Sequence, residues 1–386
     1  MILWGTMKKL ITQILCFSAV SLSLFGASMS ERVEQLEKEM ATVYQTTAMD
    51  TGTAKFAPGS PYPNQTTWFF EAEVLYWHAK SGGTEYATAY DSIALPRSGN
   101  MKDVDFEWDL GFRFGLGRFI GKERRWDINL DYTHFANHDT ESASEPNDGI
   151  VYSNAIETKV EGLSNAKFDG AIDYDSLDLM IGKSYFISRH ITVHPKIGLK
   201  GAWLDQRYKF YATDRIEELQ TELPILGNIY HKLHTDADIF GLGPRMGTDM
   251  KWYIGDGFHL FADISGALLY SRADVKFKNR IVFVPDGLAE QVSSVSLKGN
   301  KHLFCPQIAF FGGLMWGRDF HIKKGEQYLE IGLGYEVEYF WRVNQTLNVS
   351  DVQPSLSGIG SHRIDYKRTS EDVSFYGITF KARLDF

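Results

Sequence analysis

The sequence predicts an all-β chain: an antiparallel transmembrane β-barrel of at least ten strands, preceded by a short N-terminal periplasmic helix. Three observations predict it. Apolar and polar residues alternate along many segments, acidic residues occupy polar positions of those segments, and the chain ends on a strand that alternates to its last residue. Beyond the N-terminus, no run of about 18 apolar residues could cross a bilayer as a helix. A membrane protein without such runs must satisfy its backbone hydrogen bonds in a closed barrel.

The first 28 residues have the features of a secretory signal peptide. Two lysines precede an apolar stretch at residues 10–25, and small residues follow at 26–28. We expect cleavage after Ser28, with cleavage after Ser30 as the near alternative. An uncleaved membrane anchor is the other interpretation, and the shortness of the apolar stretch disfavours it.

The charge and the cysteines of the exported chain exclude several functions. Loss of residues 1–28 removes two lysines and no acid, so the formal charge moves from -9 to -11. Such an acidic chain argues against nucleic acid as a partner. Cys16 lies within the predicted signal and lacks the small residues of a lipid-attachment box, which leaves Cys305 as the sole mature cysteine. Cys305 could pair between molecules, but a buried free thiol is the expected state.

Two short segments separate the predicted signal from the predicted barrel. Residues 29–50 are assigned to a periplasmic coiled-coil-like helix, because apolar residues recur there at 3-4-3 spacing: Val33, Leu36, Met40 and Val43. This helix could form a stalk beneath an oligomeric barrel or could be only a short solvated helix. Residues 51–67 are rich in Pro and Gly and are assigned to a linker. Residues 68–386 are assigned to the barrel.

From Trp68 onward the sequence has a period of two, as β-strands do. In FEWDLGFRFGLGR (106–118) one face carries large apolar residues, namely Phe106, Trp108, Leu110, Phe112, Phe114 and Leu116. The pattern returns in WDINLDYT (126–133) and in LEIGLGYEVEYFW (329–341), where the opposite face carries glutamates. Because a buried face would make these glutamates very costly, while a wet lumen accepts them, the apolar face is predicted to contact lipid.

The strands are predicted to come in pairs that are joined by short polar turns. Strand pairs are expected in four ranges, with opening and closing strands at 68–78 and 373–386; the four ranges are 106–135, 166–211, 238–271 and 306–341. Long loops are expected between them, at 79–105, 136–165, 212–237, 272–304 and 342–372. Short turns and long loops therefore alternate along the chain, and both termini lie at the end of the barrel that carries the short turns, as in outer-membrane barrels. Ten strands enclose only a narrow lumen.

The final strand, VSFYGITFKARLDF (373–386), is the most specific single feature. Apolar residues alternate along it up to the C-terminal aromatic: Tyr376, Ile378, Phe380, Ala382, Leu384 and Phe386. Such a terminus resembles the one read by the outer-membrane assembly machinery, which is therefore an expected partner. The predicted location is the bacterial outer membrane, with lipid around the barrel.

No motif in the sequence indicates catalysis, a cofactor or a metal. The glycine patterns at 115–121 and 241–247 lack G-x-G-x-x-G spacing and open no helix. His190 and His194 stand four apart, which on a strand is about 13 Å and too far for one metal ion. We therefore expect no enzymatic activity, no cofactor and no metal.

The polar faces of the strands supply the candidate functional residues. They are predicted to line a water-filled lumen, where facing acidic and basic rows would orient polar solutes. In the alternative interpretation these charges pair with one another and only fill the barrel. The candidates are Glu71, Glu73, Glu107, Asp109, Arg113, Asp127, Asp131, Lys196, Lys200, Arg245, Asp249, Lys251, Asp263, Glu330, Glu336, Glu338, Lys381 and Arg383.

Several ordered stretches together are similar to the major outer membrane protein family of Legionella, which has relatives among environmental chlamydiae. They are FEWDLGFRFGLG (106–117), WDINLDYTHF (126–135), YDSLDLMIGKSY (174–185), HPKIGLKGAWLDQRYKFY (194–211), FGLGPRMGTDMKWYI (240–254) and GYEVEYFWRVNQ (334–345). The resemblance implies a pore-forming outer-membrane barrel, a porin. Better-known relatives of this family use cysteine cross-links in the envelope, which the single mature cysteine of this chain puts in doubt.

The sequence thus predicts passive diffusion of small hydrophilic solutes through the barrel. The alternative is a structural or adhesive surface barrel that acts through its long external loops. A homo-oligomer is compatible with both hypotheses.

Overall fold

The fold is taken from a computed structural model of the chain, which describes residues 67–90, 98–121, 125–144, 150–153, 163, 165–188, 190–218, 225–286, 289–322, 325–350 and 365–386. The chain divides into two units, Met1–Lys55 and Phe56–Phe386, and every described residue lies in the second. The predicted signal peptide, the predicted periplasmic helix and nearly all of the predicted linker lie outside the described residues. Across the described ranges, the chain has no helix with the length and apolarity needed to traverse a membrane.

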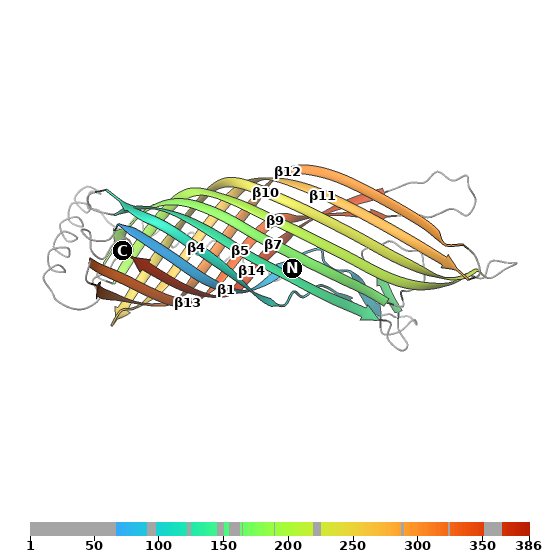
Figure 1. Ribbon diagram of the computed structural model, residues 1–386, viewed down its shortest axis with the longest axis horizontal. Coiled ribbons are helices and arrows are strands. Elements are labelled where there is room, and N and C mark those ends of the chain that lie inside the picture. Colours follow the sequence, from blue (N-terminus) through green and yellow to red (C-terminus); the bar gives the residue numbers. More distant parts are fainter. Residues whose placement is uncertain are drawn as a thin grey trace, which may run out of the picture. The chain divides into compact units, whose positions relative to one another are not determined.

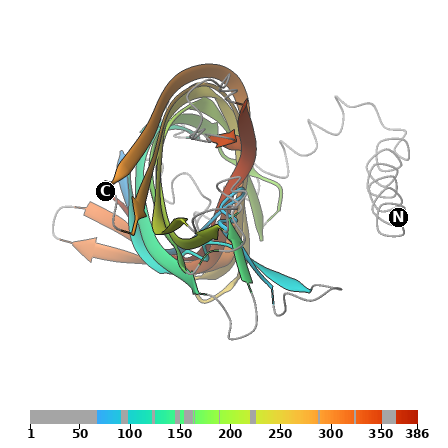
Figure 2. The same cartoon turned by 90° about the vertical axis from the view of Figure 1, so that its right-hand side faces the viewer.

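Ten antiparallel strands close into a barrel, which confirms the predicted barrel of at least ten strands (Figures 1 and 2). Each strand pairs with the next along the chain, β14 pairs with β1, and the additional pairing of β9 with β10 completes the ring. The strands of the barrel are β1 (Trp68–Ser81), β4 (Trp108–Ile120), β5 (Trp126–Ser144), β7 (Asn165–Lys183), β9 (Ile191–Glu218), β10 (Ile225–Gly255), β11 (Phe258–Pro285), β12 (Gln291–Ile322), β13 (Gly325–Ser350) and β14 (Asp365–Asp385).

Four shorter strands accompany the barrel. β2 (Ala87–Tyr90) lies between β3 (Gly99–Lys102) and β6 (Ile150–Ser153) in a separate three-stranded sheet, and β8 (Tyr185–Phe186) pairs with β9. The segment that carries β2 and β3 brings buried aromatic side chains with it. Tyr86, just before β2, packs 5.6 Å from the ring of Phe168 on β7.

The turn between β10 and β11, at GDG (255–257), confirms the short polar turn that was predicted within the strand pair 238–271. Gly255, Asp256 and Gly257 all have positive φ values, of 146°, 53° and 85°. A Cβ atom on Gly257 would also collide with the backbone oxygen of Gly317. Glycine is therefore required at this position both for its backbone conformation and for the close approach of β12.

The predicted long loops at 212–237, 272–304 and 342–372 are wrong over most of their length. β9 continues to Glu218, β11 to Pro285 and β13 to Ser350, and each pairs there with the strand that follows it (Figure 1). The reason is that the alternation is reversed in these parts of the strands: apolar residues point inward and polar residues point outward. In this part of β11 the inward residues Val275 and Phe277 are apolar, whereas the outward residues Lys276 and Lys278 are charged. A pattern of apolar-out and polar-in was expected throughout, so the reversed pattern was not recognised as strand.

In the half of the barrel where the phase is not reversed, a belt of exposed apolar side chains covers the outer surface. These side chains alternate with inward-facing residues and form what we call the apolar belt: Phe70, Val74, Leu110, Phe112, Phe114, Leu116, Leu130, Leu179, Leu199, Leu242, Ile264, Leu268, Ile308, Phe310, Leu333, Tyr335, Ile378 and Phe380. Apolar side chains are stable on the outside of a protein where lipid replaces water. The apolar belt therefore marks the height at which the barrel crosses the membrane.

A charge placed in the apolar belt should destabilise the barrel strongly. We expect Val74→Arg to lower the free energy of unfolding in lipid vesicles by about 2–4 kcal/mol, because arginine is costly near the bilayer midplane. The matched control is Asn300→Arg, at an exposed outward position of β12 beyond the apolar belt. Urea titrations followed by tryptophan fluorescence measure both. Equal stabilities of the two variants would contradict this placement of the membrane.

Candidate functional site

Inside the apolar belt, the barrel is filled with charged side chains. They come from every strand of the ring except β12 and are buried or half-buried. We call this set the charged cluster: Glu71, Glu73, Arg113, Asp127, Asp131, Asp178, His194, Lys196, Lys200, Arg245, Asp249, Lys251, His259, Asp263, Glu330, Glu336, Glu338, Lys381, Arg383 and Asp385. Strand alternation explains why these side chains point inward, because each lies an even number of positions from the other inward residues of its strand.

Arg113 on β4 is the centre of one part of the charged cluster. Its guanidinium lies 2.6 Å from Glu73, 2.9 Å from Glu336 and 3.4 Å from Glu338. It also donates a hydrogen bond to Thr133 and lies over the ring of Trp77. One cation thus holds three buried carboxylates from β1 and β13. Removal of the cation would leave these carboxylates without this counter-charge.

A second group of ion pairs lies where β14 pairs with β1. Lys381 lies 2.8 Å from Glu71 and 3.1 Å from Glu73. Arg383 lies 3.0 Å from Glu71 and 2.7 Å from Asp385, with its guanidinium 4.0 Å from the ring centre of Phe69. The closing strand thus supplies the cations that neutralise acids of the opening strand.

A third group joins β5, β9, β10 and β11. Lys196 lies 2.7 Å from Asp249 and 2.6 Å from Asp263. The ring of His194 lies between two carboxylates, 2.7 Å from Asp127 and 3.2 Å from Asp249.

Two further carboxylates, Asp178 and Glu330, complete the network. Arg245 pairs with Asp178 at 2.6 Å, and Lys200 lies 3.2 Å from the same carboxylate. Glu330 receives both Lys251, at 2.6 Å, and His259, at 2.8 Å. The charged cluster is therefore a nearly complete web of opposite charges rather than two separated rows.

The charged cluster surrounds a cavity. About 120 Å³ of it is open to the centres of water molecules, enough for several waters. Its walls include Glu71, Asp131, Lys196, Asp263 and Lys381. The carboxylate of Asp131 accepts a hydrogen bond from Asn129 at 2.5 Å, and among the described residues no cation lies within ion-pair distance of it. The cavity is thus polar, and its lining carries more carboxylates than Lys and Arg side chains.

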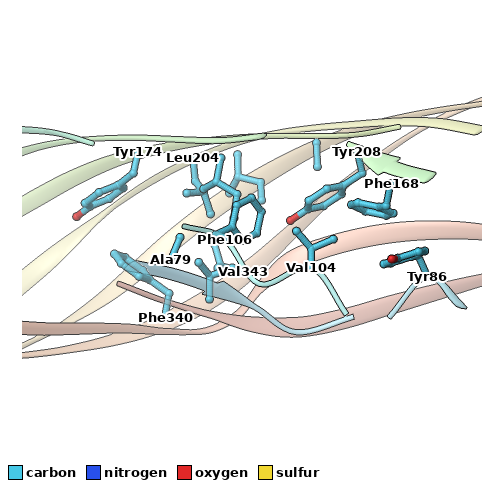
Figure 3. Close-up of a cluster of buried hydrophobic side chains, with 14 of the residues drawn as sticks. Ala79, Tyr86, Val104, Phe106, Phe168, Tyr174, Leu204, Tyr208, Phe340 and Val343 are labelled. Atoms are coloured by element: carbon cyan, nitrogen blue, oxygen red, sulfur yellow. The ribbon is translucent and has the colours of Figure 1, made fainter. Parts of the chain in front are cut away.

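Next to the charged cluster, toward the reversed-phase half of the strands, apolar side chains fill the barrel (Figure 3). We call the part that adjoins the charged cluster the apolar layer: Leu75, Trp77, Phe135, Tyr174, Ala202, Leu204, Ile239, Leu269, Cys305, Phe340, Val343 and Phe375. The ring of Tyr174 stacks on Phe375 at 4.9 Å and meets Phe340 at 5.5 Å. The cavity between these side chains holds only about 10 Å³, which is at the lower limit for one water molecule.

Three hydrogen bonds fix the apolar layer to the charged cluster. The indole of Trp77 donates to the hydroxyl of Thr379 at 3.0 Å, and that hydroxyl donates to Glu336 at 2.8 Å. The hydroxyl of Tyr174 donates to Glu338 at 2.8 Å. The large aromatic rings are therefore held in place by the carboxylates that Arg113 neutralises.

Most of the predicted lumen residues lie in the charged cluster, but two do not. Glu107 precedes β4 and Asp109 is its second residue; both side chains are exposed, and neither forms an ion pair with the charged cluster. Phe106, expected on the lipid face, is buried in the barrel interior instead. The cause is that β4 begins only at Trp108, so the chain before it crosses the interior rather than continuing the strand (Figure 3).

The predicted set omitted four members of the charged cluster. Asp178 and Asp385 share parity with inward residues of their strands, so alternation could have found them. His194 was considered only as a metal ligand, and His259 was not among the predicted lining residues, although both lie at inward positions. In the ranges that the structure describes, no group of His, Cys, Asp and Glu is arranged to hold a metal ion.

One known protein family matches most of the chain. The family described as Legionella pneumophila major outer membrane protein precursor matches residues 61–386. The chain matches none of the curated proteins with which it was compared, and the relatives among environmental chlamydiae stay a prediction.

Among solved structures, the chain is similar to the outer membrane protease OmpT from Escherichia coli, with 10% identity and a TM-score of 0.33, over 88% of this chain and 99% of that one. The toluene transporter TodX of Pseudomonas putida matches with 8% identity and a TM-score of 0.23, over 84% and 90% of the two chains. A Pseudomonas aeruginosa FadL homologue matches with 10% identity and a TM-score of 0.20 over the same shares. At these scores the likenesses carry no argument about activity.

Proposed function

This chain belongs to the Legionella pneumophila major outer membrane protein family, and from that premise we propose that its barrel is a narrow, closable pore for small hydrophilic solutes. The barrel lies in the bacterial outer membrane. Water and polar solutes would occupy the charged cluster, and the apolar layer would act as the gate. Small solutes would cross without a cofactor or an energy source.

One observation carries the proposal: a polar cavity that can hold water lies at the height of the membrane, lined by both signs of charge. A barrel that only had to be stable could fill this space with apolar side chains, because a buried ion pair contributes little net stability compared with well-packed hydrophobic residues. A solute path, in contrast, needs polar groups that replace the water around a solute.

The apolar layer sets the condition for transport. Its cavity has almost no room for water, so ions meet a barrier where they would lose their hydration. Hydrophobic constrictions gate channels in this way, by drying and wetting. Free diffusion, as first expected from the sequence, is thus replaced by diffusion through states in which the aromatic rings of the apolar layer separate.

Planar-bilayer recordings test the proposal. We expect short, rare conductance steps from the folded barrel, with mild preference for cations, because carboxylates outnumber Lys and Arg in the charged cluster. Reversal potentials in a salt gradient measure that preference. A correctly folded preparation without any conductance steps would contradict the proposed pore and favour the second candidate function.

That second candidate is a structural or adhesive surface barrel. It is favoured by the apolar layer itself, which packs like a protein core and needs no transport role. In this case the barrel would stay closed, and exchange of the external connections would abolish surface contacts while leaving solute uptake unchanged.

A further inference from the structure

Beyond the apolar belt, the wall of the barrel is incomplete on one side. β1 and β4 have 14 and 13 residues, whereas the other strands of the ring have 19 to 32. β5 pairs with β4 only as far as Phe135 but continues to Ser144. β14 begins at Asp365, before its first pairing with β1 at Val373. Among the described residues, no strand pairs with either extension from the side of β1 and β4, so a gap in the wall lies there.

The connection between β1 and β4 lies at this gap. We call its described part the inner segment: residues 82–90 and 98–107, which include β2 and β3. β2 pairs on one edge with β3 and on the other with β6, which belongs to the connection between β5 and β7. The connections on the two sides of the gap thus share one small sheet that is separate from the ring.

The inner segment places apolar side chains inside the barrel (Figure 3). The exposed fractions of Tyr86, Val104 and Phe106 are only 1%, 4% and 1%. The ring of Tyr86 lies 5.6 Å from that of Phe168 on β7 and 6.4 Å from that of Phe210 on β9. Because β7 and β9 are not neighbours of β1 in the ring, these contacts show that the inner segment reaches across the interior.

Gly170 on β7 makes room for the ring of Phe106. A Cβ atom on Gly170 would lie 3.2 Å from the Cζ atom of Phe106, which is closer than ordinary van der Waals contact. The absence of a side chain at this inward position therefore matches the ring that the inner segment inserts.

Hydrogen bonds fasten the inner segment to both sides of the gap. On the side of β14, the backbone NH of Gly82 donates to the carbonyl of Asp372 at 2.9 Å. On the side of β5, the side-chain amide of Asn137 donates to the carbonyl of Glu107 at 2.6 Å.

The inner segment is held less firmly than the ring. Four residue pairs join β2 to β3 and four join β2 to β6, whereas the 19 residues of β5 pair with β7 along their whole length. Proteins open locally where few backbone and apolar contacts have to be broken. Release of the inner segment breaks few contacts and leaves every pairing between strands of the ring intact.

We propose that the inner segment is a plug that withdraws from the barrel while the ring of strands stays closed. Withdrawal opens the interior beyond the apolar layer to the outside through the gap between β5 and β14. Phe106 and Tyr86 are the anchors of the closed state. The role of the plug in transport rests on the proposed pore, but its withdrawal does not.

Thiol labelling tests withdrawal without reference to conductance. The reporter is Val104→Cys in a Cys305→Ser background, in the full barrel folded in lipid vesicles, and the probe is a water-soluble maleimide. Adding Phe106→Ala should raise the labelling rate about a hundredfold, because loss of a ring from a packed interior strongly destabilises the closed plug. The matched control is Phe119→Ala, which removes a buried ring at the other end of β4 and should change the rate by no more than about twofold.

A milder variant keeps this test decisive where Phe106→Ala does not fold. Asn137→Ala removes only the hydrogen bond to Glu107 and should raise the labelling rate about fivefold. Equal labelling rates in the release variants and in Phe119→Ala would overturn the proposal, because Val104 would then become accessible only through unfolding of the whole barrel.

A reversible lock tests the role of the plug in transport. F106C/G170C in the Cys305→Ser background is joined by a short bis-thiosulfonate reagent and recorded in planar bilayers. Conductance steps should disappear and return when a reductant is added. The control A136C/D173C joins cross-strand partners on the outer face of β5 and β7, and its conductance should stay unchanged.

The outcomes of the two tests separate the plug from the pore. A locked barrel that conducts like the reduced one would overturn the plug and leave the pore standing. Fast labelling of the release variants without conductance steps in any variant would support withdrawal and contradict the pore.

Discussion

Replacement of both Phe340 and Phe375 by alanine is expected to raise the open probability and conductance of the barrel several-fold. Both rings contact Tyr174 in the apolar layer, and their removal opens a gap large enough for water where wild type has almost none. Single-channel recordings in planar bilayers, combined with graded neutral solutes, measure the effect and the size of the opening.

The same substitutions cost stability, so the control must match them in size. Each Phe→Ala change in a packed interior costs about 3–5 kcal/mol, and a folded fraction has to be isolated first. Phe112→Ala with Phe380→Ala removes two rings from the apolar belt, outside the barrel, and should leave conductance unchanged. A folded F340A/F375A barrel that conducts like wild type would contradict the assignment of the gate to the apolar layer.

Substitution of Arg113 by leucine is expected to lower the free energy of unfolding by about 3–5 kcal/mol, because it leaves Glu73, Glu336 and Glu338 without their shared cation. Urea unfolding in lipid vesicles measures this loss. The control is Arg207→Leu, which breaks an exposed ion pair with Asp173 at 2.8 Å and should cost about 1 kcal/mol or less.

A second variant distinguishes the loss of charge from the loss of packing. Combining Arg113→Leu with Glu336→Gln and Glu338→Gln removes two of the three carboxylate charges that Arg113 contacts and should restore a large part of the stability. If the triple variant were no more stable than Arg113→Leu alone, the contribution of Arg113 would be steric. The charged cluster would then not be the electrostatic network described above.

Alternation alone was sufficient to predict the membrane-crossing half of the barrel. In β4 and β13 the apolar residues face lipid and the polar residues face the interior, and the face of each residue follows from the period of two. The terminal strand ending at Phe386 was also predicted, and it closes the ring against β1 as expected.

Beyond the membrane the same reasoning failed, since the surroundings of the strands change. Val275 and Phe277 point inward there because water replaces lipid on the outside and apolar contacts replace water on the inside. Because one phase of alternation was assumed throughout, the ends of the long strands were predicted as loops, and the apolar layer was not predicted.

The residues of the charged cluster could be predicted, but their pairing could not. Arg113 and Glu336 are far apart in the sequence. They meet across the barrel interior because closure of the ring leaves only β14 and β1 between their strands. Which acid faces which base depends on the register and the closure of the barrel, and neither can be read from a single strand. The alternative of paired charges therefore describes the cluster better than opposed rows do.

The most direct test of a closable pore uses Cys305, whose side chain is fully buried in the apolar layer. A small, positively charged thiol reagent is added during single-channel recording, with Cys305→Ser as the control. The account predicts that the reagent reaches Cys305 when the layer opens and then reduces the cation current of wild type, while the control is unaffected. Steps that persist unchanged after complete modification of Cys305, or steps with no modification at all, would contradict a path through the apolar layer.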